Sequence, residues 1–432
     1  AGQPPTPRHA CCFAAGAADA GDRRAKYAGA NVLAPMVRCG TLPLRLFALE
    51  SGAHLAYGEE LVSMRFEKAA RVSNERLGSA DVVGHDGRVL FRTLERERGR
   101  CIFQLGTGDG ASALRAAELV ARDVAAVDLN MGCPKKFSTS GGMGAALLRE
   151  PERAEDILKT LRRNLPATCG VSCKIRLLDD GTGDKRTFDP RASVELARRL
   201  EACGIDALAV HCRMPDQRTR EPAFWEHLAP VRDAIKTAAL VLNGDVYRYE
   251  DFDRARAATG ADAAMAARSA MWNPTVFSPH GMMSKEDAMR RFAELCLETD
   301  NILANTKYTL KEMQLGGGAK WGRQPTGSLE DGVGKGINRA KTYRELFVAL
   351  DHAAWHDDFV KGLRPQPTRC PKHAGQQQQH QQQVDSGPAD AGHQRVGEKR
   401  SGRDECASLG CEAKVCRTHI SAEVGAGAAR AR

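Results

Sequence analysis

The chain has 432 residues, of which 42% are hydrophobic and 27% are charged. That length exceeds one ordinary core and is enough for a (β/α)8 barrel of roughly 250 residues with a smaller part beside it. The 63 Lys and Arg residues outnumber the 54 Asp and Glu residues, for a net charge of +9. This modest excess suits a polyanionic partner such as RNA but does not require one. No apolar run approaches the about 18 residues of a membrane span, so we expect no membrane partner.

The start of the chain and its cysteines bear on location. Residues 1–27 are rich in Ala, Gly and Arg and are expected to form a disordered leader; the alternative is the remnant of an organelle transit peptide. The 14 cysteines are scattered through segments with helix and strand patterns. That distribution favours free thiols in a reducing compartment over a disulfide framework. We therefore expect a cytoplasmic protein, or an organellar one if the leader is a transit remnant.

Short apolar runs alternate with longer amphipathic stretches between Asn31 and Ala267. Apolar residues in the longer stretches recur at three- and four-residue steps, which indicates helices with one buried face. Eight short strands joined by such helices imply a parallel sheet, and eight is the number of strands in a closed TIM barrel. The predicted strands are 31–37, 55–57, 101–105, 124–130, 171–175, 207–211, 239–243 and 263–266, with helices that include 111–121, 151–164, 190–203 and 249–259.

Three further segments complete the organisation. Asp86-Gly87 lies between two β-prone runs within residues 81–93, which predicts a β-hairpin inserted in the barrel. Residues 285–363 have only helical periodicity and predict a small helical domain. Beyond them the chain is Gln-rich and polar and cannot bury enough apolar surface to fold alone. The expected division is a leader at 1–27, a barrel at 28–281, a helical domain at 282–363 and a disordered tail at 364–432.

Polar and reactive side chains gather where the predicted strands end. In a barrel the carboxyl ends of all strands meet at one face, and that face carries the chemistry. The loops after the seventh and eighth strands are the usual phosphate site of this fold. Here they supply Gly244, which lets backbone N–H groups approach an anion, and Arg268, which can grip phosphate with two hydrogen bonds. A phosphorylated cofactor is therefore expected, and Gln104 and Lys174 would suit a flavin ring.

Several stretches resemble the tRNA-dihydrouridine synthases, specifically the eukaryotic type that modifies position twenty of the tRNA D loop. They are LAPMVRCGTLPLRLFAL, EELV, FRTLERERGRCIFQLGT, DLNMGCPKKFSTSGGMGAALL, SCKIRLL, ALAVHCR, MAARSAMWNPTVF and NTKYTLKEM. The resemblance runs from about Asn31 to His352. Cys212 stands where the family usually has Gly, and no double-stranded-RNA-binding pattern follows the helical region, unlike in animal members.

The resemblance implies an FMN-dependent oxidoreductase that reduces the C5=C6 bond of a D-loop uridine with NADPH. Hydride goes to C6 and the proton comes from Cys133 to C5. NADPH would visit only transiently, since no GxGxxG unit follows a strand. The helical domain would contact tRNA, and the protein would act as a monomer. The resemblance assigns FMN to Pro35, Met36, Gln104, Lys174, His211, Asn243, Gly244 and Arg268, to which we add their neighbours Asp245 and Ala267, and assigns the uracil side to Asn130, to which we add Arg213.

Two other readings stay open, and no metal site is expected. One is an FMN barrel that reduces a free pyrimidine or enone. The other is a non-catalytic RNA-binding barrel. Cys406, Cys411 and Cys416 recur at five-residue steps, whereas zinc sites use tighter pairs.

Overall fold

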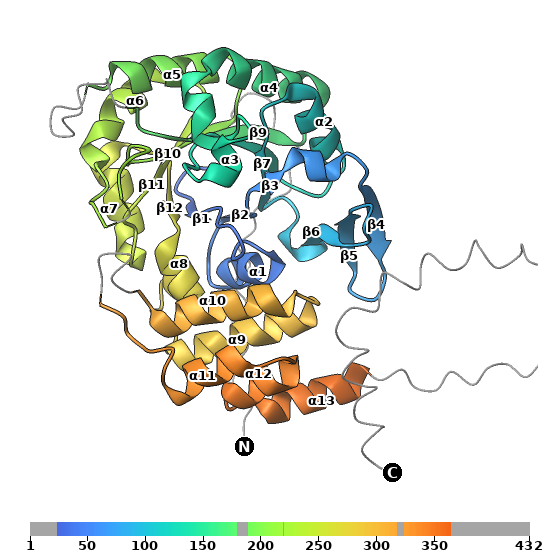
Figure 1. The fold of residues 1–432 in the computed structure, drawn as a ribbon. Helices are drawn as coiled ribbons and strands as arrows, with labels where there is room; N and C mark the ends of the chain where they lie inside the picture. The colour runs from blue at the N-terminus through green and yellow to red at the C-terminus, as the bar shows by residue number, and fades with distance from the viewer. Residues whose placement is uncertain (1–23, 179–188, 219, 318–323, 364–432) are drawn as a thin grey trace, which may run out of the picture. The chain divides into compact units, whose positions relative to one another are not determined.

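The computed structural model describes residues 24–178, 189–218, 220–317 and 324–363. Its centre is a closed barrel of eight parallel strands (Figure 1). The strands follow one another around the barrel in chain order, and the pairing of β2 with β7 closes it. This confirms the predicted TIM barrel. The barrel strands are β1 (Asn31–Leu33), β2 (Leu55–Tyr57), β7 (Cys101–Gly106), β8 (Ala126–Asn130), β9 (Gly170–Arg176), β10 (Ala207–His211), β11 (Ala239–Asn243) and β12 (Ala263–Ala266).

Small apolar side chains fill the barrel interior. Most of the strand residues in this buried cluster are Ala or Val, and Tyr27 packs among them with 2% of its surface exposed. Because side chains alternate between the two faces of a strand, every second residue is turned inward. We expected the disordered leader to extend to residue 27, but Tyr27 belongs to the barrel.

Amphipathic helices surround the barrel, as predicted. Local signals set their ends: Pro151 is the first residue of α4, Asp109 accepts a hydrogen bond from Ser112 N at the start of α2, and Gly260 ends α7 at φ 67°. The helices of the barrel are α1 (Leu42–Glu50), α2 (Gly110–Glu118), α3 (Lys136–Thr139), α4 (Pro151–Asn164), α5 (Arg191–Glu201), α6 (Ala229–Ala234), α7 (Tyr249–Thr259) and α8 (Arg268–Trp272).

A three-stranded antiparallel sheet is inserted between β2 and β7. The strands β5 (Ser79–Val83) and β6 (Val89–Leu94) form the predicted hairpin. The sequence did not predict its third strand, β4 (Ala70–Asn74), because that strand is polar and largely exposed. A short strand, β3 (Leu61–Val62), pairs with the end of β7.

Helices follow the barrel, as predicted: α9 (Lys285–Glu298), α10 (Leu303–Leu315), α11 (Gly332–Arg339) and α12 (Tyr343–Ala349). In this region α9 packs against α1 and α10 against α8 (Figure 1). The chain up to Ala353 is one compact unit. Most of α13 (Ala353–Leu363) belongs to a second unit, and in it Trp355 stacks on Phe359 with ring centres 5.0 Å apart. The expected domain boundary at residue 282 stays a prediction.

One strand is shorter than predicted. We expected the first strand to reach Val37, but β1 ends at Leu33. Pro35 has no N–H to donate to a neighbouring strand, and the Met36 carbonyl accepts from Gly40 N at 2.7 Å in a turn. The predicted tail and most of the leader lie outside the described residues.

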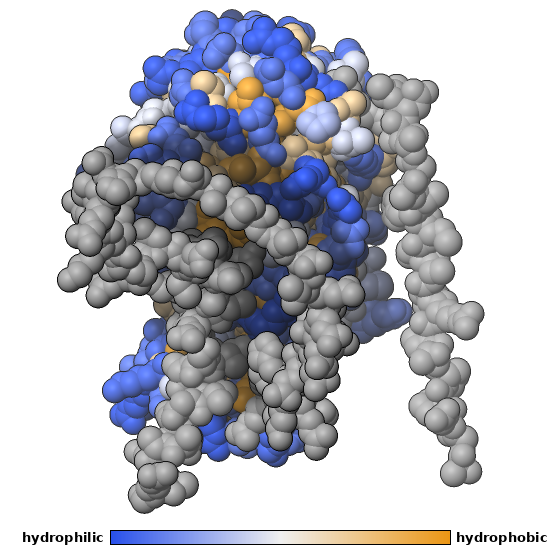
Figure 2. Space-filling model, turned by 90° about the vertical axis from the view of Figure 1, so that its right-hand side faces the viewer, coloured by the Kyte–Doolittle hydropathy of each residue, from blue (hydrophilic) through white to orange (hydrophobic). Residues whose placement is uncertain are grey.

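Hydrophilic side chains dominate much of the face shown in Figure 2, with apolar side chains gathered near its upper centre. Within the described ranges, no helix is both long enough and apolar enough to cross a membrane.

Candidate active site

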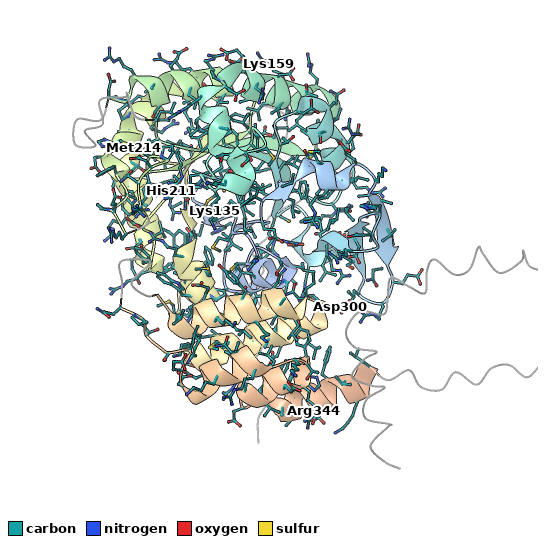
Figure 3. The ribbon with its side chains drawn as sticks, in the orientation of Figure 1. Lys135, Lys159, His211, Met214, Asp300 and Arg344 are labelled. Carbon is teal, nitrogen blue, oxygen red and sulfur yellow. The ribbon has the colours of Figure 1, made fainter. Side chains whose placement is uncertain are left out.

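The predicted site residues gather at the carboxyl ends of the barrel strands. Strand register brings Asn130 beside Lys174 and His211 beside Asn243. Arg176 ties two of the loops together, since it donates to Gly132 O at 2.8 Å and to Met214 O at 3.1 Å. Figure 3 shows Lys135, His211 and Met214 on this part of the barrel.

Cys133 lies on a turn that Asn130 holds. The Asn130 Oδ1 atom accepts from Gly132 N at 2.9 Å and from Cys133 N at 3.3 Å. The Cys133 carbonyl accepts from Ala145 N at 2.9 Å. Burial raises the pKa of the Cys133 thiol, and the Glu60 carboxylate beside it raises that pKa further. The cysteine is therefore a half-buried thiol that stays protonated at neutral pH.

Lys174 is an ammonium without an ion pair among the described residues. Its side chain is 8% exposed. Burial, and then the charge of Arg176, lowers the pKa of Lys174 to about 8. Lys174 thus offers an uncompensated positive charge to a ligand that carries or develops negative charge.

His211 is neutral and its tautomer is set by Arg213. The Arg213 Nη1 atom lies 3.2 Å from His211 Nε2. A guanidinium can only donate, so Nε2 accepts and the ring proton is on Nδ1. Burial and the cations around it, Arg176 first, hold the pKa of His211 well below its usual range. His211 can therefore offer one N–H to a ligand.

Asp245 binds two arginines of the site, Arg213 and Arg268. Arg213 Nη2 donates to its two oxygens at 2.6 and 2.8 Å, and Arg268 Nη2 donates to Oδ1 at 2.6 Å. Tyr247 and the backbone of Ala223 donate to the same carboxylate. Burial opposes ionisation of Asp245, but the hydrogen bonds and charge of Arg213 prevail and lower its pKa. Asp245 and Arg213 thus serve mainly to hold Arg268 and His211 in place, and their predicted ligand contacts stay predictions.

Two buried amides are oriented by partners inside the barrel. Gln104 Nε2 donates to Asp128 Oδ2 at 2.9 Å, so its Oε1 is left as an acceptor. Asn243 Nδ2 donates to Met265 O at 3.1 Å, which again leaves the oxygen. Burial raises the pKa of Asp128 to about 6. Sequence reasoning missed Asp128 because its role depends on a partner in another strand.

A small cavity of about 120 Å³ lies beside His211. Gly244 lines it at φ 129°, and a Cβ added there would lie 2.9 Å from the Ala223 Cβ. Only glycine suits this position, both for its backbone conformation and for space. The lining residues are His211, Arg213, Asn243, Gly244, Asp245, Val246, Tyr247, Met265, Ala267 and Arg268, which include six of the predicted cofactor residues.

Two other predicted residues follow the carboxyl end of β1. Pro35 and Met36 are half-buried in the loop after β1. In the described part of the chain no group of three His, Cys, Asp or Glu side chains could hold a metal. The three tail cysteines at 406, 411 and 416 are outside that part. Sequence reasoning also missed Glu60, which follows β2 and lies beside Cys133.

Comparison with known proteins supplies the family. The family model for dihydrouridine synthase (Dus) matches residues 32–361. A tRNA-dihydrouridine(20) synthase [NAD(P)+] of Schizosaccharomyces pombe is 36% identical over 340 residues, covering 77% of this chain and 67% of that protein. The protein of the same name from Saccharomyces cerevisiae is 36% identical over 307 residues, covering 66% of this chain and 77% of that protein. The chain therefore belongs to the dihydrouridine synthase family.

Proposed function

We propose that the chain is an NAD(P)-dependent tRNA-dihydrouridine synthase, an oxidoreductase that reduces the C5=C6 bond of the D-loop uridine at position twenty. The observation that carries the proposal is Cys133, a protonated thiol on the Asn130 turn that interacts electrostatically with the cations Lys174 and Arg176. The names of the two yeast relatives support the substrate and the reductant.

The residues at the mouth fit FMN. Gly244 leaves room at the small cavity, and Arg268, fixed by Asp245, provides a charged donor for a phosphate. Gln104 keeps an acceptor, and His211 keeps a donor, for the polar atoms of the ring system. Lys174 supplies positive charge. When bound, FMN would supply the hydride that NADPH provides.

The chain's own groups can then bind uracil and stabilise its developing charge. The Asn130 oxygen is used within the turn, so its amide N–H groups are left for a uracil carbonyl. Negative charge builds on C5 and on the carbonyl oxygens when C6 gains a hydride. Lys174 and Arg176, both desolvated, lie near enough to Cys133 for charge interaction with it. Cations fixed in a dry site stabilise such charge more strongly than water does.

Cys133 would donate the proton. A neutral thiol gives up a proton to a carbanion more readily than water does, and a positioned acid contributes roughly 10²–10⁴ in rate. His211 is held neutral and lacks a spare proton of suitable acidity. We therefore assign proton donation to C5 to Cys133, and ligand binding to His211.

The decisive test is Cys133→Ala. The variant should retain bound FMN, identified by mass spectrometry after release, and should still be reduced by NADPH. It should form dihydrouridine more slowly by on the order of 10²–10⁴. The measurement is dihydrouridine at each D-loop position of unmodified tRNA. Cys203→Ala is the matched control, because Cys203 lies in the turn after α5 and its thiol donates to Arg199 O of that helix.

Parental dihydrouridine formation by Cys133→Ala would refute its role as acid. Equal turnover of free uracil and tRNA would favour the free-pyrimidine reading. We also propose that the enzyme acts as a monomer. We place it in the cytoplasm, because the free thiols of the described residues suit a reducing compartment.

A further inference from the structure

A buried carboxylate lies beside the Cys133 turn without a complete set of partners. Glu60 lies between β2 and β3 and is 7% exposed. Its Oε1 accepts from Ser138 Oγ at 2.8 Å. Its Oε2 is buried and has no hydrogen-bond partner among the described residues. Leaving a buried carboxylate oxygen unsatisfied costs free energy, so a role for that charge is expected.

Two glycines make room for this arrangement. A Cβ added at Gly106 would lie 2.6 Å from Glu60 Oε1. A Cβ added at Gly144, which has φ 58°, would lie 2.6 Å from the Cys133 carbonyl and would also strike Ser138 Oγ. Glu60, Ser138 and the Cys133 turn therefore pack closely because both positions lack a side chain.

The charged groups around Cys133 act on its thiol in opposite directions. Lys135 acts on the thiol from its own loop, and Lys174 and Arg176 act on it from β9. All three cations favour the thiolate. The Glu60 carboxylate opposes them, because its negative charge acts directly on the thiol and favours the neutral form. Without the Glu60 carboxylate, the charges around the thiol would shift toward those of the three cations.

We propose that Glu60 is a positioning residue: its buried carboxylate keeps Cys133 as the neutral thiol, the form that can donate a proton. The proposal rests on the proposed function, in which Cys133 is the acid. In that step the S–H bond breaks, the proton bonds to C5, and sulfur keeps the electron pair as a thiolate, which then recovers a proton from water. An enzyme whose Cys133 is already a thiolate has no proton to give.

Alkylation of Cys133 tests this without requiring catalysis. Only the thiolate reacts with iodoacetamide, and mass spectrometry of the Cys133 peptide separates it from the other cysteines. In the FMN-loaded enzyme, Cys133 of Glu60→Gln should be alkylated on the order of tenfold faster near pH 8. A tenfold rise in the thiolate fraction corresponds to lowering the pKa of the thiol by about one unit. Glu60→Asp keeps the charge and should stay closer to the parent.

The matched control is Glu59→Gln. Glu59 is the adjacent carboxylate, and it accepts from Arg38 N at 2.7 Å. The pH profile of Cys133 alkylation in this variant should be the same as in the parent.

The pH dependence of dihydrouridine formation should rank the parent, Glu60→Asp and Glu60→Gln in the same order as the alkylation rates do. In Glu60→Gln the loss of dihydrouridine-forming activity at alkaline pH should begin at a lower pH than in the parent. The flavin content and the rate of flavin reduction by NADPH should stay unchanged. Superimposable Cys133 alkylation profiles for Glu60→Gln and the parent would overturn the proposal, as would identical profiles for Glu60→Gln and Glu60→Asp. The failure of Cys133 as the acid would show separately, as parental activity in Cys133→Ala.

Discussion

At the scale of single residues, side chains predicted to act separately form one connected group. Arg213 is 2% exposed and makes hydrogen bonds to His211, Asp245 and the Glu221 carbonyl. Its part in the site is therefore to fix the His211 tautomer and the position of Asp245. Asp245 in turn holds Arg268 beside the cavity. The groups proposed to bind the ligand at this corner therefore depend on side chains that need not touch it.

Arg268 is the residue whose loss should most directly weaken FMN binding. Arg268→Ala removes a charge-assisted hydrogen bond to the phosphate, and such bonds contribute about 1.5–3 kcal/mol. Titration of the apoprotein with FMN, followed by quenching of flavin fluorescence, measures the change. Arg254→Ala is a suitable control, since Arg254 lies on the outside of α7 and is 66% exposed. An unchanged FMN affinity in Arg268→Ala would show that the phosphate binds elsewhere.

At the scale of elements, most barrel strands and the four helices whose bounds were predicted agree with the structure to within a few residues. The apolar pattern of α4 is strong, and α7 has a capping box at its start and Gly260 at its end. The misses have physical causes. β1 ends at Leu33, shortly before Pro35, and β4 has no apolar periodicity because neither of its faces is deeply buried. Sequence periodicity reports burial, so it cannot reveal a strand that stays at the surface.

The helical region should also be needed for the stability of the barrel. Arg291 of α9 pairs with Glu50 of α1 at 3.0 Å, and Arg92 of the inserted sheet donates to Thr299 O at 2.7 Å. Phe292 of α9 is fully buried. A chain that ends at residue 281 would expose the apolar faces of α1 and α8 to water. We expect it to be largely insoluble.

Expression and thermal unfolding, compared with a chain that ends at residue 363, measure this requirement. A soluble barrel that binds FMN after truncation at 281 would instead support two independent domains.

At the scale of the whole molecule, the net charge of +9 predicts that tRNA affinity depends on salt. Each neutralised phosphate contributes roughly −0.7 to −0.9 to the slope of log affinity against log salt. We expect several such contacts, from the basic residues of the helical region and the barrel rim. Filter binding of tRNA between low and high salt measures the slope.

A chain that ends at Pro365 should keep both the salt dependence of tRNA binding and most of the activity. An affinity that barely changes with salt, or an inactive truncation, would contradict this.

The sequence by itself determined the barrel, its helices and the set of residues at its mouth. These follow from local periodicity and from the rule that parallel strands present their carboxyl ends together. Only the tertiary structure decided which of those residues pair with one another. The bond from Gln104 to Asp128 and the approach of Glu60 to Cys133 join segments far apart in the chain. Such partners are set by closure of the barrel and by the space at Gly106 and Gly144, because no local pattern records what a side chain will face once the strands have assembled.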